Sequence, residues 1–382
     1  MDKKDGYGRY SFDLIEEIKN SGHRVLALTS AKSDQKEIEE CLILKASAEY
    51  LVNLQNCFLS ALKIKKIINK FSPDIVHFMT EPYAGLLPFL QIKKAKTFIT
   101  LHGTYSVPHI LLDNFFKKII SRRLSEKYYE KLDGIISVSQ YTKNHLLNYH
   151  PELDKKTRVI TNGINLNSHK PIDLARKIGN KIKKILFVGV IKPRKGILEA
   201  VEACKLYNDN FSDNFIYNII GKYDPDDNYY LKVSEKIRRY GFENKIFFRG
   251  KATDEELEEY YFNADLFLMP SVNINNDFEG FGLVYLEANA KAVPCIGSKN
   301  SGCQEAIING KTGFIVDPRN AEEIACKMDL ILNKKAINAE DCVAWAMQNN
   351  IKEKAKQMID FYDLRALNNS ILSFPRKRES RS

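Results

Sequence analysis

Short runs of apolar and β-branched residues alternate with longer segments of helical spacing in the first half of the chain. The expected strands cover residues 23–28, 75–79, 97–101, 134–138 and 158–161. Ahead of them, residues 11–21 repeat apolar side chains near helical spacing and are followed by Gly22, as at a helix C-terminus. This alternation predicts an α/β domain in which helices wrap a parallel sheet.

The same alternation starts again at Lys184 and predicts a second sheet. Its expected strands cover residues 184–190, 214–221, 245–250, 264–271, 292–298 and 313–316, and helical patterns follow over residues 320–332 and 339–367. Residues 165–181 are polar, contain Pro171 and show no strand pattern, so we expect the hinge there. The expected division is an N-terminal domain over residues 1–168, a C-terminal domain over 169–345, a helix over 346–367 that returns to the first domain, and a basic disordered tail over 368–382.

Two glycines lie at the start of the chain. Gly6 and Gly8 are typical of the loop that follows the first strand of a parallel α/β domain, yet no strand pattern precedes them. We therefore expect the first strand of the N-terminal domain to be missing, either because translation starts later than in related proteins or because upstream residues are absent from the chain.

The composition is that of a globular protein with room for two cores. The chain has 382 residues, of which 44% are hydrophobic and 28% are charged. No apolar stretch approaches the roughly 20 residues that a membrane-spanning helix needs, and the first residues lack the pattern of a secretory signal. We expect a cytoplasmic protein.

The net charge of +10 fits a nucleic-acid partner, an anionic membrane surface or a merely basic soluble protein. No recognition motif with interleaved stacking aromatics occurs, so we expect no nucleic-acid partner. Residues 114–131 place Phe115, Ile119 and Ile120 beside lysines and arginines, which indicates a peripheral contact with the inner face of a membrane. An ordinary surface helix explains the same pattern equally well.

The chain shows no pattern of metal ligands. Its seven cysteines are scattered without a C-x-x-C pair and predict buried, reduced thiols. The seven histidines all precede Cys204, so no four closely spaced ligands suggest a structural zinc site. No D-x-D pair stands at a strand end to hold a catalytic ion. We expect neither a metal nor another cofactor.

The segment 270–302 carries the most informative residues. A strand ends near Ser271, a polar loop follows, and a helix is expected to begin near Phe281, where free backbone N–H groups form an anion site. Glu279 lies in the loop and Glu287 lies about two turns into the helix, since seven residues separate them. Both glutamates could accept hydrogen bonds from the hydroxyls of a sugar and a ribose that lie across the helix start. The alternative is that they only cap or solvate an exposed helix.

A series of motifs, taken in its order and spacing, resembles the retaining nucleotide-sugar glycosyltransferases of family 4, which have the GT-B fold. The motifs are DGYGRYSFDLIEEIKNSGHRV, SPDIVHF, TLHGTYSVP, DGIISVSQYTKNHL, RVITNGIN, KILFVGVIKPRKGI, RGKATDEELEEYYFNADLFLMPS, FEGFGLVYLEA and INGKTGFIV. The resemblance implies two Rossmann-like, doubly wound parallel-sheet domains that face a cleft. It also implies transfer of a hexose from a nucleotide diphosphate sugar to a glycan or lipid-linked acceptor in cell-surface polysaccharide assembly.

The resemblance assigns the donor site to the C-terminal domain. Glu279 would contact the donor sugar and Glu287 would hold the ribose. The backbone after Glu279 would also contact the sugar, through Gly280, Phe281, Gly282 and Leu283.

A lysine in the loop after the first strand of that domain, Lys195, would neutralise the donor diphosphate, as a cation at a strand-to-helix turn can. Many relatives have arginine directly after the glycine of this strand, whereas here Gly189 is followed by Val190. Arg194 would supply the second positive charge, and a surface-facing Arg194 is the alternative.

In the N-terminal domain, the resemblance makes Gly6 and Gly8 the loop that lets phosphate and acceptor approach the backbone. It places His102, at the carboxyl end of a strand, beside the donor sugar near the reacting carbon. The nucleobase would lie against the backbone of residues 250–253.

No unambiguous carboxylate nucleophile is visible, so the preferred mechanism is electrostatic. Lys195, Arg194 and the helix start would stabilise charge on the leaving diphosphate while the acceptor hydroxyl attacks from the same face. Other hypotheses stay open. An epimerase of the same fold would convert a nucleotide sugar without an acceptor, and a phosphorylase would need a lysine-bound pyridoxal cofactor. A degenerate protein that binds nucleotide sugar without transfer is favoured by the missing strand and by Val190.

Overall fold

The computed structural model describes residues 6–30, 41–44, 54–90, 92–103, 127, 129–166, 182–275 and 277–371. The chain divides by its internal contacts into two compact units. The first unit contains Met1–Ser137, His145–Ile160 and Lys352–Ser382, and the second contains Val138–Asn144 and Thr161–Ile351. Each unit is built on a parallel sheet, which confirms the predicted α/β class. The expected hinge over residues 165–181 and the basic segment 114–131 lie almost wholly outside the described residues.

The first unit contains a four-stranded sheet in the order β3-β4-β5-β6, in which all neighbours are parallel. Its strands are β3 (Ile75–Phe78), β4 (Lys96–Leu101), β5 (Gly134–Ser137) and β6 (Thr157–Val159). A separate parallel pair is formed by β1 (Ala27–Ser30) and β2 (Cys41–Leu44). β4 and β5 are buried along almost their whole length, as expected for strands covered on both faces.

Helical segments connect these strands. They are α1 (Gly6–Asn20), α2 (Leu54–Phe71), the 3₁₀ segments η2 (Glu81–Phe89) and η5 (Pro151–Lys156), and α11 (Ile351–Ile371). The helix α4 (Gln140–Leu147) follows β5, and its first residues are grouped with the second unit. No helix within the described part of the chain is long and apolar enough to cross a bilayer.

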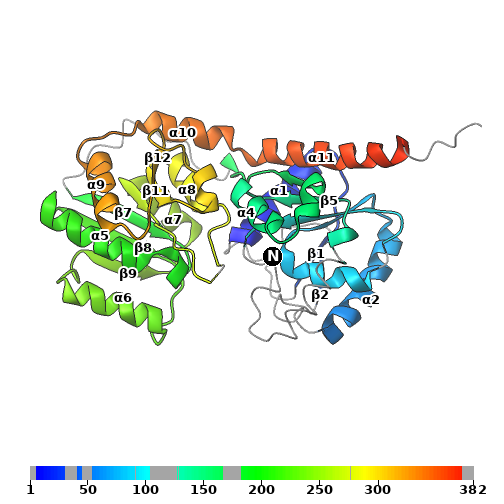
Figure 1. Cartoon of the computed structure of the whole chain (residues 1–382), viewed down its shortest axis with the longest axis horizontal. Coiled ribbons are helices and arrows are strands. Elements are labelled where there is room, and N and C mark those ends of the chain that lie inside the picture. Colours follow the sequence, from blue (N-terminus) through cyan, green and yellow to red (C-terminus); the bar gives the residue numbers. More distant parts are fainter. Residues whose placement is uncertain are drawn as a thin grey trace, which may run out of the picture. The chain divides into compact units, whose positions relative to one another are not determined.

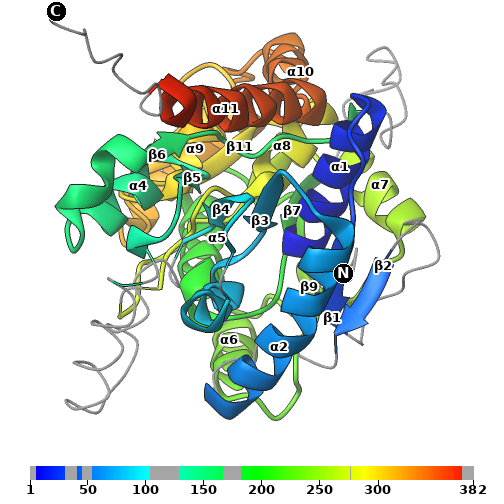
Figure 2. The ribbon, with the colours of Figure 1, turned by 90° about the vertical axis from the view of Figure 1, so that its right-hand side faces the viewer.

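Helix α11 is tied to the first sheet by an aromatic pair, Phe361 and Tyr362. Their ring centroids lie 5.7 and 4.7 Å from that of Phe98 on β4. The Tyr362 hydroxyl lies 2.6 Å from Nδ1 of the half-buried His77, whose Nε2 lies 2.8 Å from Oγ1 of Thr100. Figure 2 shows α11 running along this sheet. The last helix is therefore part of the first unit's core although it follows the second unit in sequence.

The second unit contains a six-stranded sheet in the order β12-β11-β10-β7-β8-β9, again with all neighbours parallel. Its strands are β7 (Lys183–Val188), β8 (Phe215–Ile220), β9 (Ile246–Gly250), β10 (Leu266–Leu268), β11 (Cys295–Ser298) and β12 (Gly313–Val316). From β7 the next two strands, β8 and β9, extend the sheet to one edge. The strand that follows, β10, pairs with the other side of β7, and β11 and β12 extend the sheet to the opposite edge. This order is that of a doubly wound sheet.

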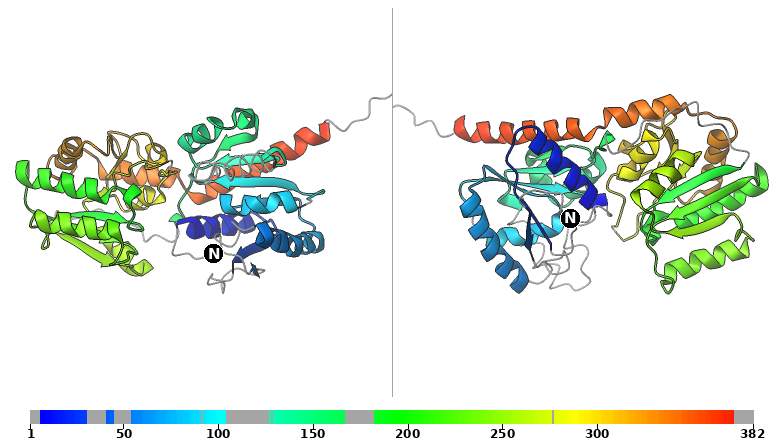
Figure 3. Two further views of the ribbon diagram at one scale, coloured as in Figure 1. Left: turned by 60° about the horizontal axis from the view of Figure 1, so that its bottom comes forward. Right: turned by 180° about the vertical axis from the view of Figure 1, so that it is seen from behind.

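Helices cover both faces of this sheet (Figures 1 and 3). They are α5 (Ile197–Asn210), α6 (Asn228–Arg239), α7 (Asp254–Asn263), α8 (Leu283–Ala290), α9 (Ala321–Leu332) and α10 (Ala339–Gln348), with the 3₁₀ turns η8 (Pro193–Lys195) and η9 (Gly302–Glu305). α5 contacts α6 and α9, whereas α8 contacts α10. The large core between them contains fully buried side chains from every strand of the central part of the sheet.

Several predicted boundaries differ from the structure. The strand expected over residues 23–28 begins at Ala27, because the ladder of β1 with β2 runs from Ala27 to Ser30. The helix expected over 339–367 is two helices, α10 and α11. Their break lies where Asn349 and Ile351 exchange backbone hydrogen bonds with Ile164, which takes these groups out of the helical pattern.

The described cysteines are free thiols, as expected from their scattered positions. Five of them are buried, whereas Cys326 on α9 is exposed, so the prediction of burial was wrong at this position. The helical pattern of α9 explains the difference, since Ile324, Ala325 and Met328 form its buried side and Cys326 lies off that side.

We predict that Tyr362→Phe lowers the stability of the first unit. The substitution removes the hydroxyl that pairs with Nδ1 of the half-buried His77, and leaving a buried polar atom without its partner costs about 1–3 kcal/mol. Thermal unfolding of the purified variant measures the loss. Tyr149→Phe, at a side chain that is 37% exposed, is the control. Equal melting temperatures for Tyr362→Phe and the wild type would contradict the assignment.

Candidate active site

The order of the second sheet places the carboxyl ends of β7 and β10 side by side. β7 pairs with β10 through Ile185 and Leu266, and the chain runs away from β7 in opposite directions on its two sides. In open parallel sheets, ligands bind at this switch point, beyond the carboxyl ends of the strands. A ligand site is therefore expected at the loops that follow β7 and β10.

The loop after β7 turns tightly into α5. Pro193–Lys195 form a 3₁₀ turn, and Gly196 caps α5 in the left-handed region with φ 70°. A Cβ at Gly196 would lie 1.8 Å from the carbonyl oxygen of Pro270, so only glycine fits. The N–H of Val272 donates to the carbonyl of Arg194 at 2.9 Å. The two loops are thus joined through their backbones, which fixes the position of the basic turn.

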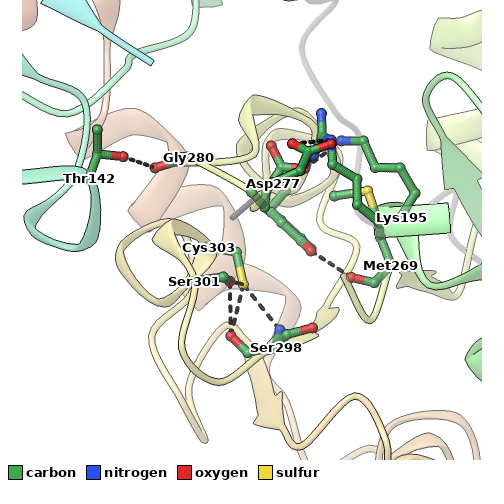
Figure 4. Close-up of polar contacts among 11 residues, drawn as sticks. Thr142, Lys195, Met269, Asp277, Gly280, Ser298, Ser301 and Cys303 are labelled. Atoms are coloured by element: carbon green, nitrogen blue, oxygen red, sulfur yellow. Dashed lines mark hydrogen bonds and ion pairs between the residues drawn. The ribbon is translucent and has the colours of Figure 1, made fainter. Parts of the chain in front are cut away.

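Two cations of the first loop share one carboxylate of the second. Arg194 Nη1 lies 2.9 Å from Oε2 of Glu279, and the ammonium group of Lys195 contacts the same oxygen. Arg194 Nε also lies 3.3 Å from Oδ1 of Asp277. Figure 4 shows Lys195 and Asp277 of the two loops close to each other. We call Arg194, Lys195, Asp277 and Glu279 the charged cluster.

Burial and charge act together on this cluster. Burial raises the pKa of Glu279, but the positive charges of Lys195 and Arg194 outweigh it and hold the pKa at about 2. For Lys195, burial is the largest influence and lowers the pKa, while the charge of Glu279 raises it again. Glu279 is therefore ionised at every physiological pH, and its negative charge lets two cations stay close together.

The loop enters α8 through a glycine that no other residue could replace without strain. Gly282 has φ 81°, and a Cβ there would lie 2.5 Å from the ring of Tyr285. The helix starts at Leu283, close to the expected start near Phe281. Phe281 is buried and still belongs to the loop, because the left-handed turn at Gly282 must come before the helix.

The second glutamate, Glu287, lies inside α8 and is only 6% exposed. The Tyr261 hydroxyl from α7 donates to its Oε2 at 2.8 Å. A carboxylate held in this way has a fixed orientation, which suits recognition of a hydroxyl pair.

Neighbouring backbone braces the loop that carries Glu279. The N–H of Gly302 donates to the carbonyl of Glu279 at 2.7 Å, and a Cβ at Gly302 would lie 1.8 Å from the carbonyl oxygen of Gly280. From the other side, the Thr142 hydroxyl donates to the same Gly280 oxygen at 3.4 Å, as Figure 4 shows. The ring of Tyr141 packs at 5.0 Å on that of Phe278. The loop is therefore held on two sides.

In the first unit, His102 follows the last residue of β4 and is buried. Its Nε2 lies 2.9 Å from the carbonyl oxygen of Met79, so this nitrogen carries the proton. Burial lowers the pKa of His102 to about 4, although the bond to Met79 raises it. His102 is thus a neutral imidazole at physiological pH, and its ring packs edge-on against Tyr10 at 5.4 Å.

A buried carboxyl group supports the same strand end. One oxygen of Glu81 accepts hydrogen bonds from the backbone N–H groups of His102 and Gly103. Burial raises the pKa of Glu81 to about 7, although the hydrogen bonds that it accepts from backbone N–H groups lower the pKa. Glu81 therefore changes its charge near neutral pH.

Gly6 and Gly8 do not form a loop. Both lie in the first turns of α1, which begins at Gly6. The buried face of α1 includes Tyr10 and Leu14 and reaches back to Gly8. Both glycines therefore have helical backbone within the described residues. The expected glycine-rich loop was wrong at these positions.

Two sequence models of known families match the chain in consecutive stretches. The model described as Glycosyltransferase Family 4 matches residues 4–168, and the model described as Glycosyl transferases group 1 matches residues 172–358. The chain is a family 4 glycosyltransferase of the GT-B fold.

Individual relatives agree with this assignment. The chain is 24% identical over 326 residues to CapM of Staphylococcus aureus, a capsular polysaccharide biosynthesis glycosyltransferase, with 82% of this chain and 81% of CapM covered. It is 29% identical over 238 residues to an uncharacterized glycosyltransferase of Methanocaldococcus jannaschii. That match covers 60% of this chain and 55% of the relative, so it spans about half of the archaeal protein.

Solved structures share the fold at lower identity. Sucrose-phosphate synthase from Thermosynechococcus elongatus superposes with a TM-score of 0.76 at 22% identity and covers 96% of this chain and 94% of its own. HepE of Anabaena, determined in complex with UDP and glucose, superposes with a TM-score of 0.74 at 18% identity and covers 94% of this chain and 96% of its own. These likenesses confirm the predicted GT-B fold.

The structure of this family 4 enzyme brings part of the expected site together. Lys195, Arg194 and Glu279 meet in the charged cluster. Gly280, Phe281, Gly282, Leu283 and Glu287 follow along the same loop and helix. His102, Gly6 and Gly8 belong to the first unit. The roles of all these residues in catalysis and binding remain predictions.

Sequence reasoning missed several residues of the site. Asp277, Thr142, Gly302 and Glu81 each contact an expected site residue, and all four are distant in sequence from the residue that they contact. Only Asp277 had a signal in the sequence, since it is a carboxylate two positions before Glu279. In the described residues no group of three or more His, Cys, Asp or Glu side chains is placed to hold a metal ion.

We predict that Glu81→Gln changes how stability depends on pH. The folded-state pKa of about 7 lies above the unfolded value, so wild-type stability is fully present below about pH 4.5 and falls as pH rises through 7. The neutral glutamine keeps an accepting oxygen and has no such dependence. Relative to the wild type, the variant should gain up to about 3 kcal/mol between about pH 5 and pH 8. If the melting temperatures of the wild type and the variant changed with pH in the same way over this range, the raised pKa of Glu81 would be contradicted.

We predict that Gly302→Ala shifts the loop of Glu279. The added Cβ would strike the carbonyl of Gly280, and overpacking of this kind costs about 1–3 kcal/mol. The variant should melt earlier and lose the stabilisation given by nucleotide sugars. Gly310→Ala is the control, since a Cβ there meets nothing within 4 Å and only its φ of 78° is unfavourable. Unchanged donor stabilisation in Gly302→Ala would disprove the brace.

Proposed function

We propose that this glycosyltransferase is a retaining hexosyltransferase. It takes the sugar from a nucleotide diphosphate sugar and transfers it to a glycan or lipid-linked acceptor in cell-surface polysaccharide assembly. The observation that carries the proposal is the charged cluster, in which Arg194 and Lys195 are held on one carboxylate at the switch point of the second sheet.

The cluster suits a diphosphate leaving group. A diphosphate offers more negative charge and more acceptor oxygens than one carboxylate, so it can take over both cations when the donor binds. Glu279 is then available to the sugar hydroxyls, while its ionised state keeps the local charge balanced. Glu287 lies further along α8, where it would accept hydrogen bonds from the ribose.

The proposed chemistry is electrostatic. As the bond from the anomeric carbon to the diphosphate oxygen breaks, Lys195, Arg194 and the N-terminus of α8 stabilise the negative charge that grows on the leaving group. The acceptor hydroxyl attacks the anomeric carbon from the face that the diphosphate leaves, and its proton passes to a phosphate oxygen. The configuration is therefore retained. His102, a neutral imidazole at the end of β4, would border the sugar.

The relatives support the choice of donor and pathway. HepE of Anabaena is seen with UDP and glucose, and CapM of Staphylococcus aureus acts in capsular polysaccharide biosynthesis. We propose by analogy a UDP-sugar donor and a role in assembling a surface polysaccharide. Because the chain carries a net charge of +10, we further propose that the enzyme works as a peripheral protein at the cytoplasmic face of an anionic membrane.

We predict that Lys195→Ala and Glu279→Gln each lose at least about a hundredfold in transfer rate while they stay folded. Removing one preorganised charge costs about 2–4 kcal/mol of barrier. Release of the nucleotide diphosphate, measured with a panel of donors, reports the rate. Lys192→Ala, at an exposed lysine in the same loop, is the matched control and should keep its activity.

The same assay separates the proposal from its rivals. Conversion of a nucleotide sugar without any acceptor would indicate an epimerase. Donor that raises the melting temperature but is never consumed would indicate a binding protein. Full activity in either Lys195→Ala or Glu279→Gln would refute the assigned roles, and an inverted anomeric signal in the product would refute retention.

A further inference from the structure

Helix α2 of the first unit carries apolar side chains on its outer side. Phe58, Leu59 and Leu62 are 50%, 59% and 47% exposed. At 3.6 residues per turn, these three lie on about the same third of the helix circumference as Lys66 and Lys70, which are also exposed. We call these five residues the α2 outer face.

This concentration of exposed apolar side chains is unusual in the described part of the chain. Nine large hydrophobic side chains there are exposed, and three of them lie within five consecutive positions of α2. The other six are at Tyr149, Ile182, Val190, Phe211, Leu231 and Met347, each more than five residues from the next. Single exposed apolar residues are normal on a protein surface, whereas a contiguous group indicates an interaction surface.

The helix is anchored by its other side, so the outer face is presented in a fixed orientation. Cys57, Ala61 and Ile64 are buried in the core of the first unit. The ring of Phe58 packs edge-on against Phe89 of η2 at 6.0 Å, which fixes one apolar side chain of the face. Figure 2 shows α2 at the front of the first unit.

The charge of α2 has one sign. The helix contains four lysines and no aspartate or glutamate over 18 residues. α6 of the second unit offers a contrast, since the exposed Leu231 and Lys232 there stand beside Glu235 and follow the capping carboxylate of Asp227. An apolar strip bordered only by cations is complementary to the surface of an anionic lipid bilayer, in which negatively charged headgroups cover apolar acyl chains.

We propose that the α2 outer face docks the chain on an anionic lipid bilayer. The side chains of Phe58, Leu59 and Leu62 enter the boundary between headgroups and acyl chains. Lys66 and Lys70 contact lipid phosphates. α2 is about 27 Å long and lies flat on the surface, as interfacial helices do.

The charge argues for a bilayer over a second copy of the chain. In a two-fold contact each copy would present the same patch, and α2 of neither copy has a carboxylate to neutralise Lys66 and Lys70. An anionic bilayer neutralises these charges. The inference extends the proposed function by naming the surface that meets the membrane, and vesicle binding tests it without any sugar transfer.

The test is flotation of the purified full chain with lipid vesicles. The wild type should float with vesicles of phosphatidylcholine and phosphatidylglycerol, much less with phosphatidylcholine alone, and less as salt is raised. Lys66→Glu with Lys70→Glu should reduce the bound fraction more than about tenfold, since each lysine near an anionic surface is worth roughly fivefold. Leu59→Gln with Leu62→Gln should also reduce it. Leu231→Gln with Lys232→Glu on α6 is the matched control and should float as the wild type does.

Insertion has a separate readout. Phe58→Trp places an indole on the face, and its emission should shift to the blue when the anionic vesicles are added, against the baseline of the native Trp345. Because all the changed positions are exposed, we expect melting temperatures close to the wild-type value. Such values would show that the variants are folded. Equal flotation of the wild type and both α2 variants would overturn the proposal. So would a dimer that the α2 variants dissociate while vesicle binding stays unchanged.

Discussion

The contact on which the proposed donor site depends is the sharing of one carboxylate by two cations. Arg194 and Lys195 are neighbours in a tight turn, and without Glu279 their charges would repel each other in a largely buried place. Glu279 pairs with both cations, and their positive charges lower its pKa to about 2, which keeps it ionised. The arrangement keeps two positive groups and one negative group ready, at the point of the sheet where a ligand is expected.

The supports of this cluster are mostly backbone. The turn of Arg194 and Lys195 rests on the loop after β10 through Gly196 and Val272, and the loop of Glu279 rests on Gly302 and Thr142. Backbone contacts of this kind leave little freedom, because a single added Cβ would strike a carbonyl oxygen at less than van der Waals distance. The first unit uses a different device at the end of β4, where the buried carboxyl of Glu81 accepts two backbone N–H groups.

The alternation of apolar runs and helical patterns was enough to predict the α/β class and most strands, since buried parallel strands are short and continuously apolar. It could not predict the sheet order, which depends on contacts between distant segments. The break between α10 and α11 was missed because Ile164 pairs with residues that lie far along the chain. Gly6 and Gly8 were assigned to a loop from their residue type and the family motif, whereas the structure has them in the first turns of α1. Glu279 was singled out by its place in the loop before a predicted helix and Lys195 by the family motifs, whereas Glu81 and Thr142 belong to no pattern that spacing reveals.

The close approach of Gly302 to Gly280 has a bearing on how the family can diversify. When main chain rests on main chain, the path of a loop does not depend on which side chains project from it. If this loop binds the donor sugar as proposed, substitutions at the projecting positions would alter which sugar is accepted while the backbone stays in place. A change of donor preference would then need new side chains on this loop, but no new course for its backbone.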